Sequence, residues 1–390
     1  MESYEFISPG KIVFGWGRRS DVARLAKELG ERAFVVCGSR TLSACGELDR
    51  LIHLVEAAGV EVERLYDTSH EPQVEDVDCC FDILAARRAG DGDLVLAIGG
   101  GSAIDLAKAA AAMITDRQSA TVSDYLEGVG KGLKLRTPPL PVLAIPTTGG
   151  TGSEATKNAV ISSYDPPFKK SLRSDLMVPC TVLIDPELSV SVPTTTTAWT
   201  GMDAITQLIE SYLSRFAKPV PQALALGTLP IALSSLPEAV RNGASQPARE
   251  AMAHAALMSG MALANSGLGL AHGVAAALGV HSRVTHGLAC AMMLPVALRV
   301  NRPARESQLA QLARAALGGT WSTEALAADA FIEAIDQLAV VVGIPKRLSD
   351  VGVHRDQIPD LVASSRGNSM NGNPVQLSDD ELARLLEEML

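Results

Sequence analysis

The sequence predicts an α/β domain with a parallel sheet in its N-terminal half and an all-α domain in its C-terminal half. Up to about residue 190, short β-branched runs alternate with amphipathic stretches, which is typical of a parallel sheet covered by helices. From about Pro193 onward, long Ala/Leu-rich segments replace these runs. Pro186 and Pro193 bracket the short connection between the two patterns. We therefore place the domain boundary there, with domains 1–192 and 193–390.

Six short runs in the first half have the composition of strands: 11–14, 33–37, 60–65, 94–98, 142–145 and 181–184. Two of them, 94–98 and 142–145, are apolar throughout, as central strands of a parallel sheet are when helices cover both faces. In the second half, the segments 197–213, 221–236, 248–265 and 323–342 are predicted to be helices.

Composition and charge exclude several classes of protein. The chain has 390 residues, 47% of them hydrophobic, and a formal net charge of −10, and it lacks a Lys/Arg-rich run that would neutralise phosphates. The N-terminus lacks the basic-then-apolar layout of a signal peptide, and we expect no membrane-spanning segment. The six cysteines form no CxxC pair and are expected to be buried and reduced. We expect a soluble cytoplasmic protein that binds neither nucleic acid nor membrane.

Glycine-rich turns follow the two most apolar strands. Gly99, Gly100 and Gly101 come directly after the run at 94–98, and Ser102 begins a helix with Asp105 in its first turn. Glycines let the backbone approach a ligand, and a helix N-terminus attracts anions, so this turn is predicted to cradle a pyrophosphate. A tight turn without a ligand is the alternative.

The second turn reads PTTGGTGSEAT and offers Thr147, Thr148 and Thr151. Turns at the carboxyl ends of adjacent parallel strands meet at one edge of the sheet, where dinucleotides usually bind. We expect both turns to contribute to one cofactor site, with Asp105 helping to shape the first.

A set of metal-binding residue types lies in the helical half. Asp203 and Gln207 are four residues apart and share a helix face. His272, His281 and His286 lie within fifteen residues in an apolar setting, although the chain has only seven histidines. Each residue alone is more often a core or surface side chain. An aspartate oxygen, an amide oxygen and two imidazole nitrogens together suit Fe²⁺, Zn²⁺ or Mn²⁺ with a position open for substrate.

These segments together resemble the iron-containing, or group III, alcohol dehydrogenase family. The resemblance covers nearly the whole chain and includes GKIVFGWG, GGGSAIDLAKA, PTTGGTGSEAT, TGMDAITQLIE, GLGLAHG, HGLACAMMLP and a terminal GNP. It implies a Rossmann-like dinucleotide-binding domain followed by an all-helical metal domain, as in dehydroquinate synthase, with catalysis in the cleft between them. It also implies a homo-oligomer, at least a dimer.

The family's ligand pattern matches this chain at Asp203, His272 and His286, which the resemblance makes the catalytic residues. The chain departs from the family at Gln207, where the family has a third histidine, and at Ala276, where many members have a histidine near the nicotinamide. Because an amide is a weaker donor than imidazole, Gln207 bears on metal affinity and on the choice of metal. His281 is a candidate replacement for the missing proton relay.

The residues after the second strand bear on cofactor choice. NAD-dependent members often have an acidic residue there that binds the ribose hydroxyls, whereas this chain has Gly38, Ser39 and Arg40. A hydroxyl and a guanidinium favour a 2′-phosphate, so we expect NADP(H) rather than NAD(H), with a solvated Arg40 and either dinucleotide as the alternative.

The expected function is metal-dependent hydride transfer between NAD(P)(H) and a small alcohol or aldehyde. Two alternatives are a lyase like dehydroquinate synthase, which uses NAD transiently, and an inactive dinucleotide-binding homologue. Arg283, between the two metal-binding histidines, is either a residue that contacts an anionic substrate or part of a surface salt bridge.

Overall fold

The computed structural model describes residues 3–390, which form two compact units. The α/β unit comprises Ile7–Thr148 and Gly152–Val192, and the helical unit comprises residues 3–6, Gly149–Thr151 and Pro193–Leu390. The chain thus passes into the helical unit for three residues of the second glycine-rich turn before it finally leaves the α/β unit.

The α/β unit is built on a six-stranded parallel sheet with the strand order β1-β8-β5-β4-β2-β3. The strands are β1 (Lys11–Phe14), β2 (Arg32–Cys37), β3 (Glu61–Asp67), β4 (Asp93–Gly99), β5 (Val142–Pro146) and β8 (Thr181–Ile184). Every strand predicted from the sequence is present, and the predicted parallel α/β sheet is confirmed.

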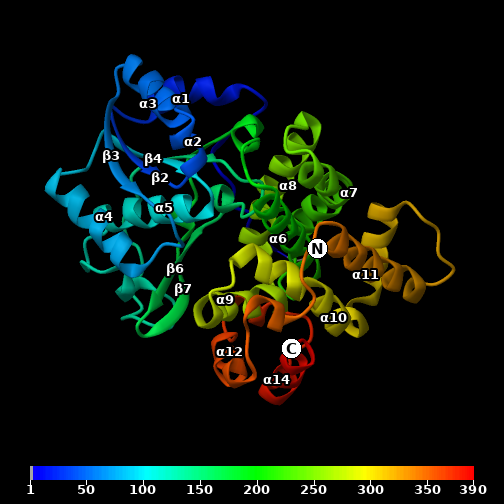
Figure 1. Ribbon diagram of the computed structural model, residues 1–390. Coiled ribbons are helices and arrows are strands. Elements are labelled where there is room, and N and C mark those ends of the chain that lie inside the picture. The colour runs from blue at the N-terminus through cyan, green and yellow to red at the C-terminus, as the bar shows by residue number, and fades with distance from the viewer. Residues whose placement is uncertain (1–2) are drawn as a thin grey trace. The chain divides into compact units, whose positions relative to one another are not determined.

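Helices cover both faces of this sheet, as Figure 1 shows, with α1 and α3 on one face and α4 and α5 on the other. In β4, Leu94, Leu96 and Ile98 belong to the apolar core on the α1 and α3 face, whereas Val95 and Ala97 belong to the core on the opposite face. The continuous apolar run is therefore a strand that alternates between two cores. The helices of this unit are α1 (Val22–Leu29), α2 (Arg40–Ala44), α3 (Glu47–Ala57), α4 (Val74–Ala86) and α5 (Gly101–Thr115).

An antiparallel hairpin in the α/β unit was not predicted. Strands β6 (Asn158–Tyr164) and β7 (Pro167–Arg173) form it, apart from the main sheet (Figure 1). Only part of β6 is apolar, and Ala159 and Ile161 fill the core that α5 covers. Their burial depends on that distant helix, so the local sequence gives only a weak strand pattern.

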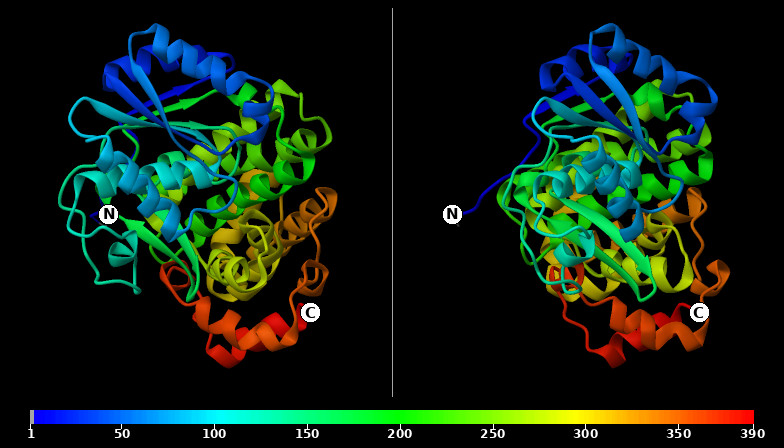
Figure 2. Two further views of the ribbon diagram at one scale, coloured as in Figure 1. Left: turned by 60° about the vertical axis from the view of Figure 1, so that its left-hand side comes forward. Right: turned by 90° about the vertical axis from the view of Figure 1, so that its left-hand side faces the viewer.

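The helical unit consists of nine α-helices around one apolar core. They are α6 (Thr194–Leu213), α7 (Pro219–Arg241), α8 (Gln246–Ser266), α9 (Leu270–Ser282), α10 (His286–Leu317), α11 (Glu324–Val341), α12 (Ile358–Ser364), α13 (Asn368–Asn371) and α14 (Asp379–Glu388). The four predicted helices correspond to α6, α7, α8 and α11. Figure 2 shows the C-terminal segment in orange and red, where α12 packs against α14.

Helix α7 has the length and apolar composition of a membrane-spanning helix, features that the core helix of a soluble protein shares. Its buried residues recur at helical spacing, for example Ala225, Leu229, Ala232 and Leu236, and they belong to the core of the helical unit. The helix also packs against α6, α8 and α10. One face of α7 is thus already used for packing inside this unit.

Candidate functional site

Three polar side chains line one buried face of α6. Asp203, Gln207 and Glu210 follow one another at helical spacing, and all three are almost fully buried. Isolated buried carboxylates are costly, so each needs bonded partners within the fold. Their partners come from α8, α9 and the residues just before α9.

Glu210 organises the start of α9. Its carboxylate accepts hydrogen bonds from the backbone N–H groups of Gly269 (3.0 Å) and Ala271 (2.7 Å), which lie at the N-terminus of that helix. The same carboxylate lies 2.7 Å from Nδ1 of His272. A Cβ atom at Gly269 would lie 2.8 Å from Oε1 of Glu210, so glycine is required for this close approach. Glu210 therefore fixes both the first turn of α9 and the imidazole of His272.

The terminal GNP motif supports the same helix end. The side chain of Asn373 accepts a hydrogen bond from the backbone N–H of Leu270 (3.0 Å), and its amide pairs with the amide of Asn301 on α10 in both directions (2.8 and 3.0 Å). Both asparagines are buried. The C-terminal segment thus joins the start of α9 to the middle of α10.

The other nitrogen of His272 meets a residue from α6. Nε2 of His272 lies 3.2 Å from Oδ1 of Asp203, and Nε2 of His286 lies 4.0 Å from the same oxygen. His286 is the first residue of α10, and one helical turn later Sγ of Cys290 lies 3.7 Å from Nε2 of His286. One ligand atom from each of Asp203, His272, His286 and Cys290 lies within 4.8 Å of every other.

Burial and charge shift the pKa values in this cluster. Burial alone would raise the pKa of Asp203, but His286 and His272 hold it below its usual range. Burial lowers the pKa of His272, but Cys290 and the two carboxylates outweigh burial and hold that pKa well above its usual range. Burial raises the pKa of the Cys290 thiol to about 12. A cation that enters the cluster must therefore displace protons from it.

The structure thus brings together three of the four predicted metal ligands. Gln207 lies one turn beyond Asp203, and its carbonyl oxygen accepts a 2.6 Å hydrogen bond from the hydroxyl of Ser259 on α8. His281 lies with Nε2 2.7 Å from the hydroxyl of Ser364 on α12, so its ring contacts that helix. Arg283 ends α9 in the left-handed conformation (φ 56°) and is exposed.

Sequence reasoning missed two members of this site. The sequence predicts only a buried thiol for Cys290, although this residue lies four residues after His286 and hence on the same helix face. Glu210 lies seven residues after Asp203 on the face already singled out. In both cases the helical spacing was the available signal.

The first glycine-rich turn of the α/β unit is tightly packed. Gly99 has a φ of 157°, which glycine adopts readily, and a Cβ atom there would lie 2.8 Å from Cβ of Ala103. A Cβ atom at Gly38, at the end of β2, would also lie 2.8 Å from Cβ of Ala103. The ends of β2 and β4 thus approach the first turn of α5 closely. Gly100, Gly101 and Ser102 are partly accessible at this helix N-terminus.

Asp105 has partners inside the protein. Its carboxylate accepts a 2.9 Å hydrogen bond from the backbone N–H of Val160 in β6 and lies 3.3 Å from the ammonium of Lys108. That ammonium donates hydrogen bonds to the carbonyl oxygens of Ser153 and Thr156. The pair is buried, so Asp105 joins α5 to the segment that follows the second glycine-rich turn and shapes the site indirectly.

The second turn is divided between the two units. Thr147 is buried, donates its backbone N–H to the carbonyl of Gly99 (3.0 Å) and lies in the α/β unit with Thr148. Thr151 belongs to the helical unit, where a Cβ atom at Gly150 would lie 2.4 Å from Cβ of Thr200. Thr147 and Thr148, which follow β5, therefore lie beside the first turn, whereas Gly150 allows close packing on α6 and Gly149 allows close packing on Met252 of α8.

Just after β2, the side chain of Ser39 caps the N-terminus of the short helix α2. Its side chain accepts a hydrogen bond from the backbone N–H of Leu42 (3.3 Å). Arg40 is exposed, and its guanidinium lies 3.5 Å from the carbonyl of Ser69. Arg40 thus presents a positive charge at the surface beside Gly38.

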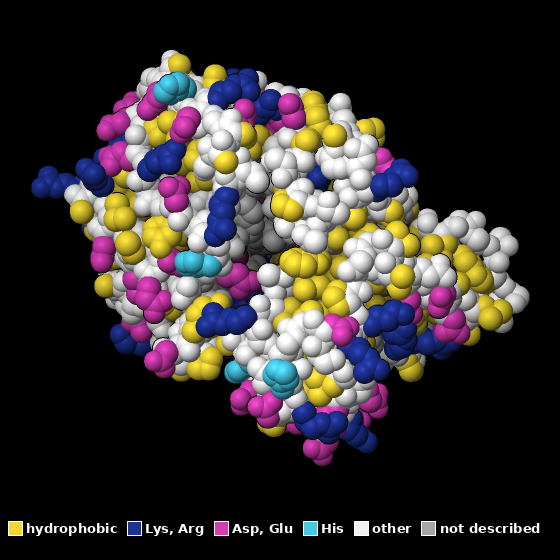
Figure 3. Space-filling model, viewed as in Figure 1, with side chains coloured by type: hydrophobic (Ala, Val, Ile, Leu, Met, Phe, Trp, Pro, Cys, Tyr) yellow, Lys and Arg dark blue, Asp and Glu magenta, His cyan; other side chains and the backbone are white. Residues whose placement is uncertain are grey.

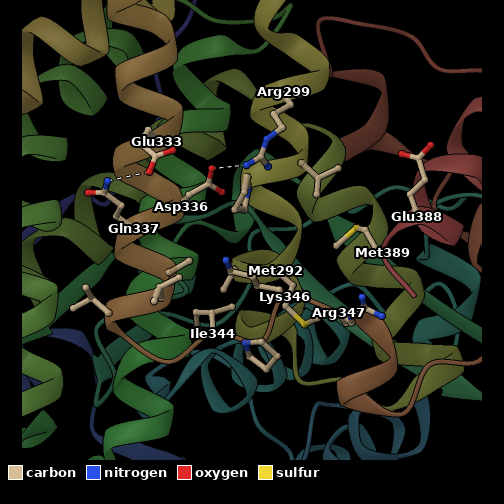
Figure 4. Close-up of a pocket in the computed structure, with 17 residues that line it drawn as sticks. Met292, Arg299, Glu333, Asp336, Gln337, Ile344, Lys346, Arg347, Glu388 and Met389 are labelled. Carbon is tan, nitrogen blue, oxygen red and sulfur yellow. Dashed lines mark hydrogen bonds and ion pairs between the residues drawn. The ribbon is translucent and has the colours of Figure 1, made fainter.

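A cavity of about 630 Å³ lies elsewhere in the helical unit, between α10, α11 and the C-terminal segment (Figure 4). An ion pair between Arg299 and Asp336 joins α10 to α11 at its wall. The residues that line it do not include a predicted metal ligand.

Figure 3 shows acidic and basic side chains interspersed over the face that it depicts, without a basic stripe of the kind that nucleic-acid binding requires.

Comparison with known proteins gives a consistent result over the whole chain. The iron-containing alcohol dehydrogenase family matches residues 9–186. The C-terminal domain of the Fe-containing alcohol dehydrogenase family matches residues 197–390. Long-chain-alcohol dehydrogenase 1 of Geobacillus thermodenitrificans is 32% identical over 98% of this chain and 97% of that protein.

Two solved structures share the fold. A 1,3-propanediol oxidoreductase superposes with a TM-score of 0.92 at 30% identity over 100% of both chains. The sulfoacetaldehyde reductase from Bifidobacterium kashiwanohense in complex with NAD+ superposes with a TM-score of 0.87 at 31% identity, over 100% of this chain and 99% of that one. These matches favour a dehydrogenase over a lyase or an inactive scaffold. The chain belongs to the iron-containing alcohol dehydrogenase family and is an NAD(P)-dependent oxidoreductase of alcohols or aldehydes.

Proposed function

We propose that Asp203, His272 and His286 hold a divalent metal ion at which a small alcohol or aldehyde exchanges a hydride with NADP(H). The observation that carries this proposal is the convergence of the three side chains from α6, α9 and α10, within 4.8 Å of one another and of Cys290. A fourth protein donor comes either from α6, as Gln207, or from α10. A bound Fe²⁺, Zn²⁺ or Mn²⁺ ion would supply a Lewis acid for the substrate oxygen.

The chain's own residues set the geometry of this site. Glu210 accepts a hydrogen bond from the N–H at Nδ1 of His272, which leaves Nε2, beside Asp203, as the atom that would bind the ion. Since Asp203 is held below its usual pKa, it presents a negative charge to the ion. The tight start of α9, fixed by Glu210 and Asn373, limits rotation of the His272 ring. These residues hold the donor atoms in place before substrate arrives.

The two glycine-rich turns supply the dinucleotide site in this proposal. Gly99, Gly100, Gly101 and Ser102 offer the pyrophosphate a helix N-terminus, and Thr147, Thr148 and Thr151 offer hydroxyls from the second turn. Asp105 acts through its bonds to β6 rather than by touching the cofactor.

Packing at the end of β2 supports NADP(H) over NAD(H). An acidic side chain at position 38 is incompatible with the present packing, because even a Cβ atom would lie 2.8 Å from Ala103. A carboxylate that would repel a 2′-phosphate is therefore absent at that position, and the exposed guanidinium of Arg40 is available to attract one.

We further propose that the protein acts in the cytoplasm as a homodimer or larger homo-oligomer. All six cysteines are free, which suits a reducing compartment. The substrate is a small alcohol or aldehyde, as the names of the relatives indicate, and Arg283 is a candidate contact for a substrate that carries an anionic group.

The decisive experiment combines metal analysis with activity. We expect purified protein to contain a transition metal and to oxidise NADPH in the presence of an aldehyde, with a lasting loss of absorbance by the reduced nicotinamide. Chelation and Asp203→Asn should each abolish this activity, and added metal should restore it only in the wild type. Full activity in protein shown to be free of metal would overturn the metal assignment.

A further inference from the structure

We propose that Cys290 is a ligand of this metal ion and supplies a thiolate in place of the amide of Gln207. The inference rests on the proposed metal site and specifies its donor set as one carboxylate, two imidazoles and one thiolate. The observation behind it is that Sγ of Cys290 lies in the same group of mutually close ligand atoms as Asp203, His272 and His286.

Three separations between the ligand atoms are close to the edges of a tetrahedral site. Bonds of about 2.0–2.1 Å to nitrogen or oxygen and about 2.3 Å to sulfur give ligand–ligand edges of about 3.3 Å, or about 3.6 Å where one ligand is sulfur. The corresponding distances are 3.2 Å from His272 Nε2 to Asp203 Oδ1 and 4.0 Å from His286 Nε2 to that oxygen. The distance from Cys290 Sγ to His286 Nε2 is 3.7 Å. All the ligand atoms of the cluster lie within 4.8 Å of one another.

The start of α10 explains why these two donors lie together. His286 is the first residue of the helix and Cys290 lies one turn further, so both side chains leave the same face. Cys290 and Asp203 are buried and His286 is half-buried, so the cluster remains partly accessible at His286.

Gln207 is less suited to the fourth position. Its carbonyl oxygen already accepts the hydroxyl of Ser259 at 2.6 Å, and an amide oxygen is a harder and weaker donor than a thiolate. The bond to Ser259 instead joins α6 to α8 beside the site. A thiolate in the donor set favours Zn²⁺ over Mn²⁺ and sets this chain apart from a site made only of nitrogen and oxygen donors.

The test uses cobalt as a spectroscopic probe in the full-length protein. Protein stripped of metal is loaded with one equivalent of Co²⁺, whose visible bands report binding and whose near-ultraviolet thiolate-to-cobalt charge-transfer band reports a sulfur ligand. We expect both signals in the wild type, and only the visible bands in Cys290→Ser. Cys80→Ser, which alters a buried cysteine of the α/β unit, and Gln207→Ala should retain the charge-transfer band.

A second measurement compares metal affinities by competition. Cys290→Ser should lower the affinity for Zn²⁺ relative to Mn²⁺ by about tenfold or more, because only Zn²⁺ gains strongly from the thiolate. Unfolding curves of Cys290→Ser and Cys290→Ala check that each variant is folded.

The outcomes separate this inference from the proposed function. The thiolate assignment would be overturned if cobalt bound without a charge-transfer band, or if the band persisted in Cys290→Ser. Neither result would contradict the proposed reductase activity. Failure of the cluster to bind cobalt at all would overturn it as well. A charge-transfer band in a protein without aldehyde reductase activity would support the thiolate ligand and contradict the proposed function.

Discussion

Nδ1 of His272 lies 2.7 Å from Oε2 of Glu210, while the other imidazole nitrogen faces Asp203. A carboxylate behind a metal-binding histidine fixes its tautomer and increases its basicity. In this chain the same carboxylate also accepts the first N–H groups of α9, so one side chain positions both the helix and the ligand that the helix carries.

Glu210→Gln should therefore weaken metal binding without abolishing it. Removal of such a carboxylate typically lowers metal affinity by about 10–100-fold. An amide cannot accept all three hydrogen bonds, because its nitrogen is a donor. Metal titration of the stripped protein measures the effect. Glu238→Gln, which changes a half-buried carboxylate on α7, is the matched control and should bind metal as the wild type does. Equal affinities for the two variants would contradict this role of Glu210.

Arg40→Ala should selectively impair the use of NADPH. A charge-assisted hydrogen bond contributes about 1.5–3 kcal/mol, so we expect KM for NADPH to rise about tenfold or more while KM for NADH changes little. Steady-state kinetics with both dinucleotides and one aldehyde provides the measurement. Arg50→Ala removes another exposed arginine of the α/β unit and should change neither KM. An equal rise for both cofactors in Arg40→Ala would show that Arg40 does not recognise the 2′-phosphate.

The raised pKa of Glu154 predicts that the free energy of unfolding depends on pH. Burial raises the pKa of Glu154 to about 7, with Lys108 acting in the opposite direction. The unfolded chain releases this proton near pH 4.3, so between about pH 4.3 and 7 the folded state binds more protons than the unfolded state. The contribution of Glu154 to the free energy of unfolding is therefore full at low pH. As the pH rises to about 7, the free energy of unfolding falls by up to about 3 kcal/mol.

The variant Glu154→Gln removes the titration but keeps the shape of the side chain. Urea unfolding from pH 5 to pH 8 should therefore show a smaller loss of stability with rising pH than the wild type shows. Glu61→Gln, at an exposed position in β3, should retain the wild-type pH profile. A Glu154→Gln profile parallel to that of the wild type would mean that Glu154 is ionised throughout this range.

Two glycines of the helical unit should respond oppositely to alanine. At Gly150 a Cβ atom would lie 2.4 Å from Cβ of Thr200 and 2.7 Å from its carbonyl oxygen, so Gly150→Ala should cost about 1–3 kcal/mol. Gly227 lies in α7 with open space around it, so Gly227→Ala should be neutral or stabilise the protein by up to about 1 kcal/mol. Thermal unfolding of both variants measures the difference. A stable Gly150→Ala variant would contradict the close approach of the turn to α6.

The main sheet was predictable because its signal is local. The central strands β2, β4 and β5 are short, largely apolar runs, and in β4 Leu96 and Val95 pack into cores on opposite faces. The β6 and β7 hairpin was not predicted, because the burial of Ala159 and Ile161 depends on α5, more than forty residues earlier in the chain. Local pattern therefore identifies strands that are buried along their whole length and misses those buried by a single distant helix.

The candidate site divides in the same way. Helical spacing was enough to place Asp203 and Gln207 on one face, and the motif spacing was enough to select His272 and His286. The partners of these residues depend on helices that are distant in sequence. Ser259 engages Gln207, and Glu210 engages His272, only because α6 packs against α8 and because α9 begins beside α6.

The sequence by itself determined the two kinds of domain, the glycine-rich turns and three of the proposed metal-binding side chains, because hydrophobic periodicity and residue spacing are properties of neighbouring residues. Tertiary structure decided which donor atoms meet. It brought Cys290 to Asp203 and the histidines, gave the oxygen of Gln207 to Ser259, and turned Asp105 toward Val160. Contacts of a few ångströms between separate helices depend on how those helices pack, and packing is a property of the whole folded unit.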